Sequence, residues 1–237
     1  SSQLADYQKA DVVIIGAGVA GLSTALHLAK LGVESVVVEA GEPGSGATGQ
    51  SGGLIAPSFI RHSPRGVIES FGEDRGLKLI NLIGGSARTC FDVIKEHKID
   101  CAAQRNGFWG PAHTENLAQQ LRVHGEEWQA FNFKVRFADQ DEAEEKLSVP
   151  RYCGALHFEE GGALNPLAYV RGLARAAQAK GVRLFTRSAV TSIERQGAKW
   201  QVKTENGIVV AEKVVLAANG GNAGLHTLMR RTVLPLR

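Results

Sequence analysis

The chain has 237 residues, of which 43% are hydrophobic and 22% are charged. These shares are typical of a folded globular protein and argue against disordered, collagen-like and membrane-spanning chains. The formal net charge of +3 is too small to indicate nucleic acid or a membrane surface as a partner. Three cysteines without CxxC spacing favour neither a disulfide framework nor a zinc site, and the opening residues lack the layout of a signal peptide. We therefore expect a cytoplasmic protein.

The first forty residues predict a βαβ unit. Residues 11–15 form an apolar run rich in β-branched side chains, which is typical of a buried parallel strand. Apolar residues at helical spacing predict a helix from Val19 to about Leu31, which Gly32 ends. A second strand is predicted at 35–39. In such a unit the carboxyl ends of both strands lie at the same edge of the sheet.

A GxGxxG motif lies between the first strand and the helix. Gly16 permits the tight turn, Gly18 lets the backbone approach a pyrophosphate, and Gly21 allows the helix to pack closely on the strand. The N-terminus of the helix then faces the phosphates with free N–H groups. Glu39 ends the second strand, where its carboxylate can accept hydrogen bonds from ribose hydroxyls and disfavours a 2′-phosphate. The motif therefore predicts a dinucleotide site.

The next segment favours FAD over a nicotinamide dinucleotide. In a nicotinamide domain the second strand leads into another helix and strand. Here Glu39 leads directly into GEPGSGATGQSGG at 41–53, whose bare glycine backbone can approach a long flavin nucleotide. A nicotinamide dehydrogenase and a flexible surface loop are the alternatives.

The middle of the chain differs in character from the βαβ unit. Residues from about 66 to 98 predict helices that are interrupted at Gly84 and Gly85. Between 107 and 165 we expect a short strand near Phe108, a helix at about 115–130 and an acidic helix near 139–147. This stretch is interpreted as an insertion or second domain.

The last third of the chain predicts one helix and then strands. Asn165 and Pro166 form an N-cap and N1 pair that opens a helix. After Gly181, successive strand patterns predict a β-meander, with Asn206 and Gly207 as a type I′ hairpin signal. The run at 214–221 is predicted to be a buried strand that rejoins the first sheet.

Five segments in this order resemble the N-terminal half of the D-amino-acid-oxidase-like flavoenzymes. They are DVVIIGAGVAGLSTALHLAKLG, VVVEA, GSGATGQSGG, GGALNPLAYVRGLARAAQAKGV and VVLAANG. The family includes glycine and sarcosine oxidases and γ-glutamylputrescine oxidoreductase, and the resemblance covers nearly all of residues 10–237. It implies an α/β fold with a glutathione-reductase-like, Rossmann-type FAD-binding domain at 10–60 and 160–237. A helical segment and part of a mixed α+β substrate domain would occupy 61–159.

The resemblance also implies an FAD-dependent oxidoreductase that acts on the C–N bond of a small amine or amino acid, with hydride transfer to flavin N5. Covalent attachment in some relatives uses histidine or cysteine, which the 41–53 loop lacks, so we expect non-covalent FAD. The strand-end segment VVLAANG and Val190, which matches the position whose backbone meets the adenine, complete the predicted site. The predicted FAD-binding residues are Gly16, Gly18, Gly21, Glu39, Ala40, Gly46, Ala47, Thr48, Gly49, Gln50, Ser51, Gly52, Gly53, Val190, Ala217, Ala218, Asn219 and Gly220.

The sequence assigns no catalytic residue and no metal ligands. Arg61, Trp109 and His113 are candidates for a substrate pocket, in which Arg61 would bind a carboxylate through its fork of donors; a solvated arginine, a core indole and a surface imidazole are the alternatives. His62 is a candidate for a flavin or substrate role, with a structural or exposed role as the alternative. Relatives continue past the position of Leu236, and residues 233–237 read as the start of a further strand. A non-catalytic or incomplete FAD-binding fragment or subunit is therefore the alternative function. Such a chain is expected to form an oligomer or to need a partner subunit that completes its fold.

Overall fold

The computed structural model describes residues 1–59, 61–226 and 229, so the strand expected at 233–237 lies outside the described residues. The chain divides into two compact units. Unit 1 comprises Ser1–Gly52, His97–Cys101 and the residues from Asn165 onward, and unit 2 comprises Gly53–Glu96 and Ala102–Leu164. The predicted boundaries of the FAD-binding and substrate domains stay a prediction, because compactness assigns no function to either unit.

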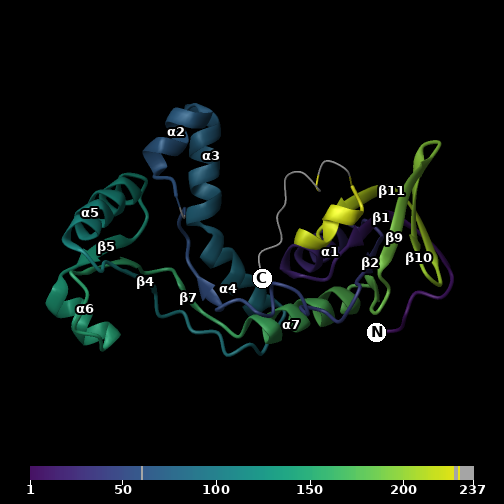
Figure 1. Cartoon of the computed structure of the whole chain (residues 1–237), viewed down its shortest axis with the longest axis horizontal. Coiled ribbons are helices and arrows are strands. Elements are labelled where there is room, and N and C mark those ends of the chain that lie inside the picture. The colour runs from purple at the N-terminus through teal and green to yellow at the C-terminus, as the bar shows by residue number, and fades with distance from the viewer. Residues whose placement is uncertain (60, 227–228, 230–237) are drawn as a thin grey trace. The chain divides into compact units, whose positions relative to one another are not determined.

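Unit 1 is built on a six-stranded sheet with the order β8-β2-β1-β11-β10-β9 (Figure 1). Strands β8, β2, β1 and β11 run parallel to one another, and β9, β10 and β11 form an antiparallel meander. The strand bounds are β1 (Tyr7–Ile15), β2 (Ser35–Val38), β8 (Arg183–Phe185), β9 (Val190–Gln196), β10 (Lys199–Thr204) and β11 (Ile208–Leu216). This mixed sheet and its helices confirm the predicted α/β fold class and the return of the 214–221 run to the first sheet.

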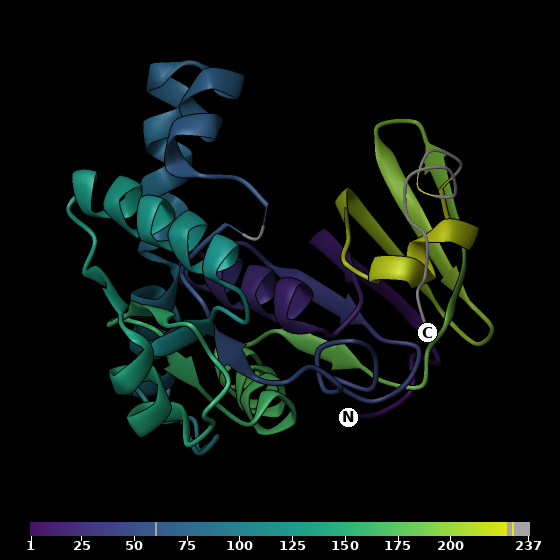
Figure 2. The same ribbon diagram turned by 60° about the vertical axis from the view of Figure 1, so that its left-hand side comes forward.

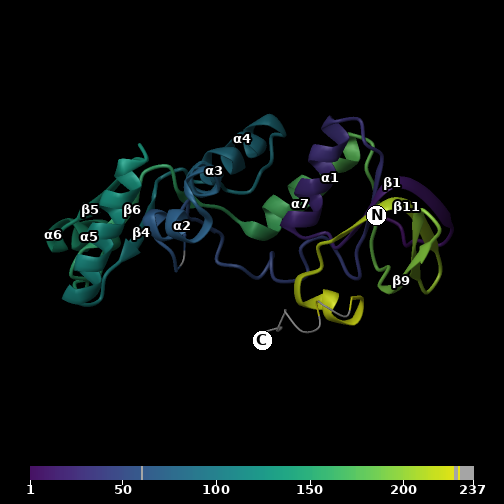
Figure 3. The same ribbon diagram turned by 90° about the horizontal axis from the view of Figure 1, so that it is seen from above.

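Two helices of unit 1 lie against each other, as Figure 3 shows. Helix α1 (Val19–Lys30) buries Leu22, Ala25 and Leu26, and Gly32 follows it with a φ of 74°. Helix α7 (Pro166–Ala179) begins as predicted, because the Asn165 side chain accepts a hydrogen bond from the Ala168 N–H and proline occupies the first turn.

The structure corrects the sequence analysis of unit 1 at three places. Strand β1 begins at Tyr7 instead of residue 11, because residues 7–10 pair with β11 beyond the end of β2. Strand β8 pairs with β2 in the parallel part of the sheet, outside the meander. The type I′ hairpin prediction is wrong, since neither Asn206 nor Gly207 has a positive φ.

The N-terminal segment accounts for the different turn. The last β10–β11 pair is Lys203 with Ile208, and the Thr204 N–H donates to the Gly207 carbonyl at 2.9 Å. A Cβ at Gly207 would lie 2.7 Å from Leu4 Cγ. Leu4, which is fully buried, therefore packs directly on the turn and favours a wider loop.

Unit 2 combines five helices with two small sheets among the described residues (Figure 2). The helices are α2 (Pro64–Phe71), α3 (Glu73–Gly84), α4 (Ser86–Glu96), α5 (Glu115–Ala130) and α6 (Gln140–Leu147). The strands β4 (Phe108–Pro111), β6 (Ala155–Phe158) and β5 (Val135–Ala138) form one antiparallel sheet in the order β4-β6-β5; β3 (Leu54–Ile55) pairs with β7 (Gly162–Ala163). The predicted helix break at Gly84 and Gly85 is confirmed, whereas the break at Gly72 was missed.

Trp128 lies at the centre of the unit 2 core and is fully buried. Its ring is stacked with Phe59 at a centroid distance of 5.4 Å and makes T-shaped contacts with Phe133 and Phe158 at centroid distances of 5.1 and 5.9 Å. The indole N–H donates to His124 Nε2 at 3.0 Å. The polar end of this large side chain therefore has a partner inside an apolar cluster, as burial of an indole requires.

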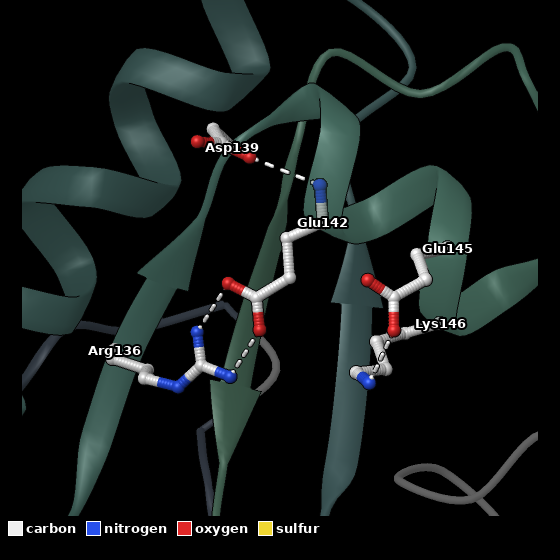
Figure 4. Close-up of polar contacts among 5 residues, drawn as sticks. All are labelled: Arg136, Asp139, Glu142, Glu145 and Lys146. Atoms are coloured by element: carbon white, nitrogen blue, oxygen red, sulfur yellow. Dashed lines mark hydrogen bonds and ion pairs between the residues drawn. The ribbon is translucent and has the colours of Figure 1, made fainter.

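An ion pair holds helix α6 to the sheet of unit 2 (Figure 4). Arg136 on β5 donates both terminal nitrogens to the two carboxylate oxygens of Glu142 at 2.7 and 2.5 Å. Asp139 caps the helix by accepting from the Glu142 N–H at 3.0 Å. The hydrogen bonds from Arg136 lower the pKa of the Glu142 carboxyl below its ordinary value.

We predict that Gly21→Ala destabilises the protein, although alanine is the better helix former by about 1 kcal/mol. A Cβ at position 21 would lie 2.0 Å from the Gly16 carbonyl oxygen, which is backbone and cannot move aside. Overpacking of this kind costs about 1–3 kcal/mol. Urea denaturation should show the loss, whereas Gly52→Ala, whose Cβ would meet nothing within 4 Å, should stay within about 0.5 kcal/mol of the parent. A more stable Gly21→Ala protein would contradict the close packing described here.

We predict that Arg136→Gln raises the pKa of Glu142 toward its ordinary value. Because the pair lowers that pKa in the folded protein, its contribution to stability is present above the ordinary glutamate pKa and is lost as the pH falls through the folded-state value. Carboxyl-carbon NMR titration measures the shift directly. Glu194, whose pKa is lowered by Lys203, serves as the internal control and should titrate unchanged.

Candidate dinucleotide-binding site

A cavity of about 430 Å³ lies in unit 1 where the carboxyl ends of β1, β2 and β11 meet. It is bounded by the turn after β1, the loop after β2 and the start of β9. Its lining residues are Ile15, Gly16, Gly18, Val38, Glu39, Ala40, Gly44, Ser45, Gly46, Ala47, Thr48, Ala189, Val190, Ala217, Ala218, Asn219, Gly221 and Leu225. Ligands of open α/β sheets bind at this edge.

The turn from β1 into α1 has no room for a side chain at Gly16. Gly16 has a φ of 110°, and a Cβ there would lie 2.6 Å from the Ala217 carbonyl oxygen. The Gly16 N–H donates to the Val38 carbonyl at 2.9 Å, and the Ala217 N–H donates to the Ile15 carbonyl at 2.8 Å. The turn is therefore fixed to both neighbouring strands by backbone hydrogen bonds.

The N-terminus of α1 opens toward the cavity without an anionic cap. Its N-cap residue is Gly18, which makes no side-chain hydrogen bond, and its first turn carries no acidic residue. The Val19 N–H meets the Thr48 hydroxyl at 3.3 Å. The free N–H groups at the positive end of the helix dipole are suited to an anionic ligand.

Glu39 connects three segments of the site. Its Oε2 accepts from the Ala17 N–H at 2.7 Å and its Oε1 accepts from the Gly41 N–H at 2.8 Å. The Glu39 backbone N–H donates to the Phe185 carbonyl at 2.9 Å, and the Ser188 N–H donates to the Glu39 carbonyl at 2.8 Å. A carboxylate has about four acceptor positions, so each oxygen keeps one for a further donor such as a hydroxyl.

Backbone hydrogen bonds give the glycine-dense loop at 41–53 a defined conformation. The Gly44 N–H donates to the Ala17 carbonyl at 3.2 Å, and the Gly49 N–H donates to the Gly44 carbonyl at 3.1 Å. A Cβ at Gly44 would lie 2.3 Å from Val170 Cγ1, so this glycine lets the loop pack against α7. Gly46 differs, because a Cβ there would meet nothing within 4 Å and its backbone lines the cavity.

Eleven of the predicted FAD-binding residues line this cavity: Gly16, Gly18, Glu39, Ala40, Gly46, Ala47, Thr48, Val190, Ala217, Ala218 and Asn219. The others do not line it: Gly21, Gly49, Gln50, Ser51, Gly52, Gly53 and Gly220. Gly21 and Gly49 pack against backbone, and Gly53 belongs to unit 2. The role of all these residues in binding stays a prediction.

The sequence analysis missed several lining residues. Ile15 and Val38 could have been found, because Ile15 is the last residue of the first predicted strand and Val38 precedes Glu39 at the end of the second, so both lie at the ligand edge. Gly44 and Ser45 lie in the loop already singled out. Ala189, Gly221 and Leu225 carry no sequence signal that distinguishes them.

The substrate-pocket candidates all lie in unit 2. Arg61 and His62 line a second cavity there. Trp109 instead stacks on His157 at a centroid distance of 4.1 Å, and His113 is exposed. Neither Trp109 nor His113 lines that cavity.

The residues of the unit 1 cavity fit a dinucleotide. Glu39 is the one charged side chain among its described lining residues, and a pyrophosphate at the α1 terminus would meet bare glycine backbone. The cavity continues past Glu39 to Val190 at the start of β9. It can therefore accommodate an extended molecule with an anionic middle and a hydroxyl-bearing sugar.

Comparison with known proteins points to the same cofactor. A family model described as FAD dependent oxidoreductase (DAO) matches residues 11–237. The chain is 34% identical to gamma-glutamylputrescine oxidoreductase of Escherichia coli K12 over 88% of this chain and 49% of the relative. It is 27% identical to a glycine oxidase of Bacillus licheniformis over 88% of this chain and 53% of the relative. The chain thus spans about half the length of the curated relatives it matches.

A solved structure shows the same fold. The crystal structure of glycine oxidase from Geobacillus kaustophilus superimposes with a TM-score of 0.79 and 26% sequence identity, covering 97% of this chain and 60% of that chain. The family match extends over nearly the whole chain and includes the glycine turn, Glu39 and the strand end at Ala217. The chain belongs to the family of FAD-dependent oxidoreductases, and its cofactor is FAD.

Proposed function

We propose that the protein oxidises the C–N bond of a small amine or amino acid, with FAD bound non-covalently in the cavity of unit 1. The observation that carries the proposal is the meeting of the glycine turn, the uncapped α1 terminus and Glu39 at one cavity. The names of the relatives, an oxidoreductase of gamma-glutamylputrescine and oxidases of glycine, support an amine or amino acid as the substrate class.

In this proposal the cofactor is held mainly by backbone. Gly16 and Gly18 present bare backbone to the pyrophosphate, and the free acceptor positions of Glu39 receive ribose hydroxyls. The backbone at Val190 meets the adenine. The segment from Ala217 to Gly220 lies beside the dinucleotide, and residues 61–159 belong to the substrate domain.

Bound FAD supplies the acceptor, at flavin N5, for the hydride that leaves the carbon beside the amine nitrogen. The protein positions the substrate, excludes water and sets the electrostatic environment of the reacting atoms. No residue of this chain has to act as an acid or base on a neutral amine.

Two further features belong to the proposal. A cytoplasmic location is supported by the odd number of cysteines without CxxC spacing. An oligomer or a partner subunit remains part of the proposal. Among the described helices, none combines the length and apolar character that a bilayer crossing requires.

The decisive experiment mixes the purified protein anaerobically with γ-glutamylputrescine, sarcosine, glycine and D-alanine in turn. We expect the visible flavin absorption to bleach with at least one of them, and acid precipitation to release FAD into the supernatant. A protein that carries FAD but is bleached by none of these amines would favour the non-catalytic alternative. Flavin that stays with the acid-precipitated protein would disprove non-covalent binding.

We predict that Glu39→Ala weakens FAD binding by about 1.5–3 kcal/mol, the range for a hydrogen bond to a charged group. The substitution removes the proposed ribose acceptor and also releases the Ala17 and Gly41 amides that Glu39 holds. Titration of apoprotein with FAD, followed by flavin fluorescence, measures the change.

Glu42→Ala is the matched control for this titration. Glu42 is a nearby glutamate that does not line the cavity, and its exposed side chain lies 3.6 Å from Arg187. Its removal should leave the dissociation constant of FAD unchanged. Equal affinities for the parent and Glu39→Ala would remove Glu39 from the cofactor site.

A further inference from the structure

Three asparagines of the chain stand directly before a glycine: Asn106, Asn206 and Asn219. Asparagine is a chemically labile residue. A following glycine makes it more so, because no Cβ hinders the approach of the glycine nitrogen to the asparagine side chain. The three pairs are identical in sequence, so a difference in their reactivity has to come from the fold.

The reaction of such a pair needs only the chain and water. The glycine backbone nitrogen loses its proton and attacks the side-chain amide carbon of the asparagine, and the C–N bond to the side-chain nitrogen breaks as ammonia leaves. Addition of water to the resulting imide gives aspartate or isoaspartate, so one neutral amide becomes one carboxylate. A glycine N–H that is buried and hydrogen-bonded cannot react until the surrounding structure opens locally.

The fold holds the Asn206 pair closed. The Gly207 N–H donates to Thr204 Oγ1 at 3.0 Å, and the Gly207 carbonyl accepts from the Thr204 hydroxyl at 3.0 Å and from the Thr204 N–H at 2.9 Å. Both residues are buried, and the fully buried Leu4 packs on the glycine. Asn206 is itself exposed, but its partner nitrogen becomes available only when this turn opens.

The Asn106 pair is held in a similar way. The Gly107 N–H donates to the Gly161 carbonyl at 3.0 Å, and the glycine is buried. A Cβ at this position would lie 2.0 Å from His157 Nε2, so the imidazole ring lies directly on the glycine. Cyclisation of Asn106 therefore also requires local opening.

The Asn219 pair lacks these restraints. Asn219 opens the short 3₁₀ helix η1 (Asn219–Gly224), and it is exposed with a φ of 47°. Gly220 is half-buried, and its N–H donates to no acceptor within the described part of the chain. The first N–H groups of a helix have no acceptor inside it. No hydrogen bond of this kind has to be broken before the Gly220 nitrogen attacks the Asn219 side chain.

We propose that Asn219 is a site of spontaneous covalent modification, which cyclises onto Gly220 and becomes aspartate or isoaspartate, while the fold protects Asn106 and Asn206. The observation that carries the proposal is the contrast between one free glycine N–H and two that are buried and hydrogen-bonded.

The modification changes the charge of the unit 1 cavity. Asn219 lines this cavity, in which Glu39 is the one charged side chain among the described lining residues. A carboxylate at position 219 adds a second negative charge and disfavours an anionic ligand. This last step rests on the proposed function: bound FAD covers Asn219 and slows its modification, and the modified chain binds FAD more weakly.

The first test ages the full-length chain, freed of FAD, at mildly alkaline pH. Peptide mapping by mass spectrometry measures aspartate and isoaspartate at the three positions over time. We expect Asn219 to react at least about tenfold faster than Asn106 and Asn206, because their glycines must first lose hydrogen bonds. Equal rates at the three positions, or a faster reaction at Asn206 or Asn106, would overturn the proposal whether or not the protein oxidises amines.

The second test opens a protected pair. Thr204→Val keeps the shape of the side chain but removes the hydroxyl that holds Gly207. Asn206 should then react about tenfold faster, and Asn219 should react as in the parent. Thr204→Ser retains the hydroxyl and is the matched control, with a rate at Asn206 close to that of the parent. An unchanged rate at Asn206 in folded Thr204→Val would show that the glycine hydrogen bonds do not control the reaction.

Asn219→Gln tests the position without touching the protected turns. The longer side chain has to close a larger ring, so acidic forms of the protein should accumulate more slowly on anion-exchange chromatography than those of the parent. If they accumulate at the parent's rate, the reacting residue is not Asn219 and the proposal is wrong.

Addition of saturating FAD to the parent tests the last step. We expect FAD to slow the reaction at Asn219 and to leave Asn106 and Asn206 unchanged. A rate at Asn219 that FAD does not alter would overturn the shielding and would contradict the proposed position of the cofactor. Failure of the modification site itself is seen separately, because it is measured in the absence of FAD.

Discussion

The close packing of the turn between β1 and α1 leaves no room for a side chain at Gly16 or Gly21, and the rest of unit 1 depends on that close approach. The Gly16 carbonyl lies where a Cβ of residue 21 would be, and the Ala217 carbonyl lies where a Cβ of residue 16 would be. Three backbone segments therefore meet at distances that only glycine allows. This contact brings the first turn of α1 over the strand ends, so the positive end of the helix and the cavity coincide.

Glu39 adds a second constraint to the same place. Its carboxylate holds the Ala17 and Gly41 amides, so the turn between β1 and α1 and the start of the glycine loop share one anchor. A residue that shapes the cavity and, in the proposed function, also offers acceptors to a ribose has two ways to affect affinity. Glu39→Ala therefore measures both effects together.

Much of unit 1 could be predicted because its site is built from backbone. Gly16, Gly18 and Gly21 predict the turn, and the β-branched runs predict the strands beside it. Glu39 follows at the end of the next strand. Prediction failed where a distant segment decided the local structure. Leu4 packs on the turn at Gly207 and overrides the Asn-Gly signal, and β8 joins β2 although it lies near the meander in sequence.

The cavity of unit 2 could not be predicted for a related reason. Its wall comes from side chains at 59, 108, 121 and 158, which have ordinary core residue types and no shared spacing. Only the antiparallel pairing of β4 with β6 and the packing of α5 bring them together. A site formed by backbone can be recognised in the sequence by its glycines. A site formed by apolar side chains has residue types that cannot be distinguished from those of any hydrophobic core. Arg61 illustrates the difference, because its type suggested a carboxylate and only the folded chain places it beside an apolar cavity.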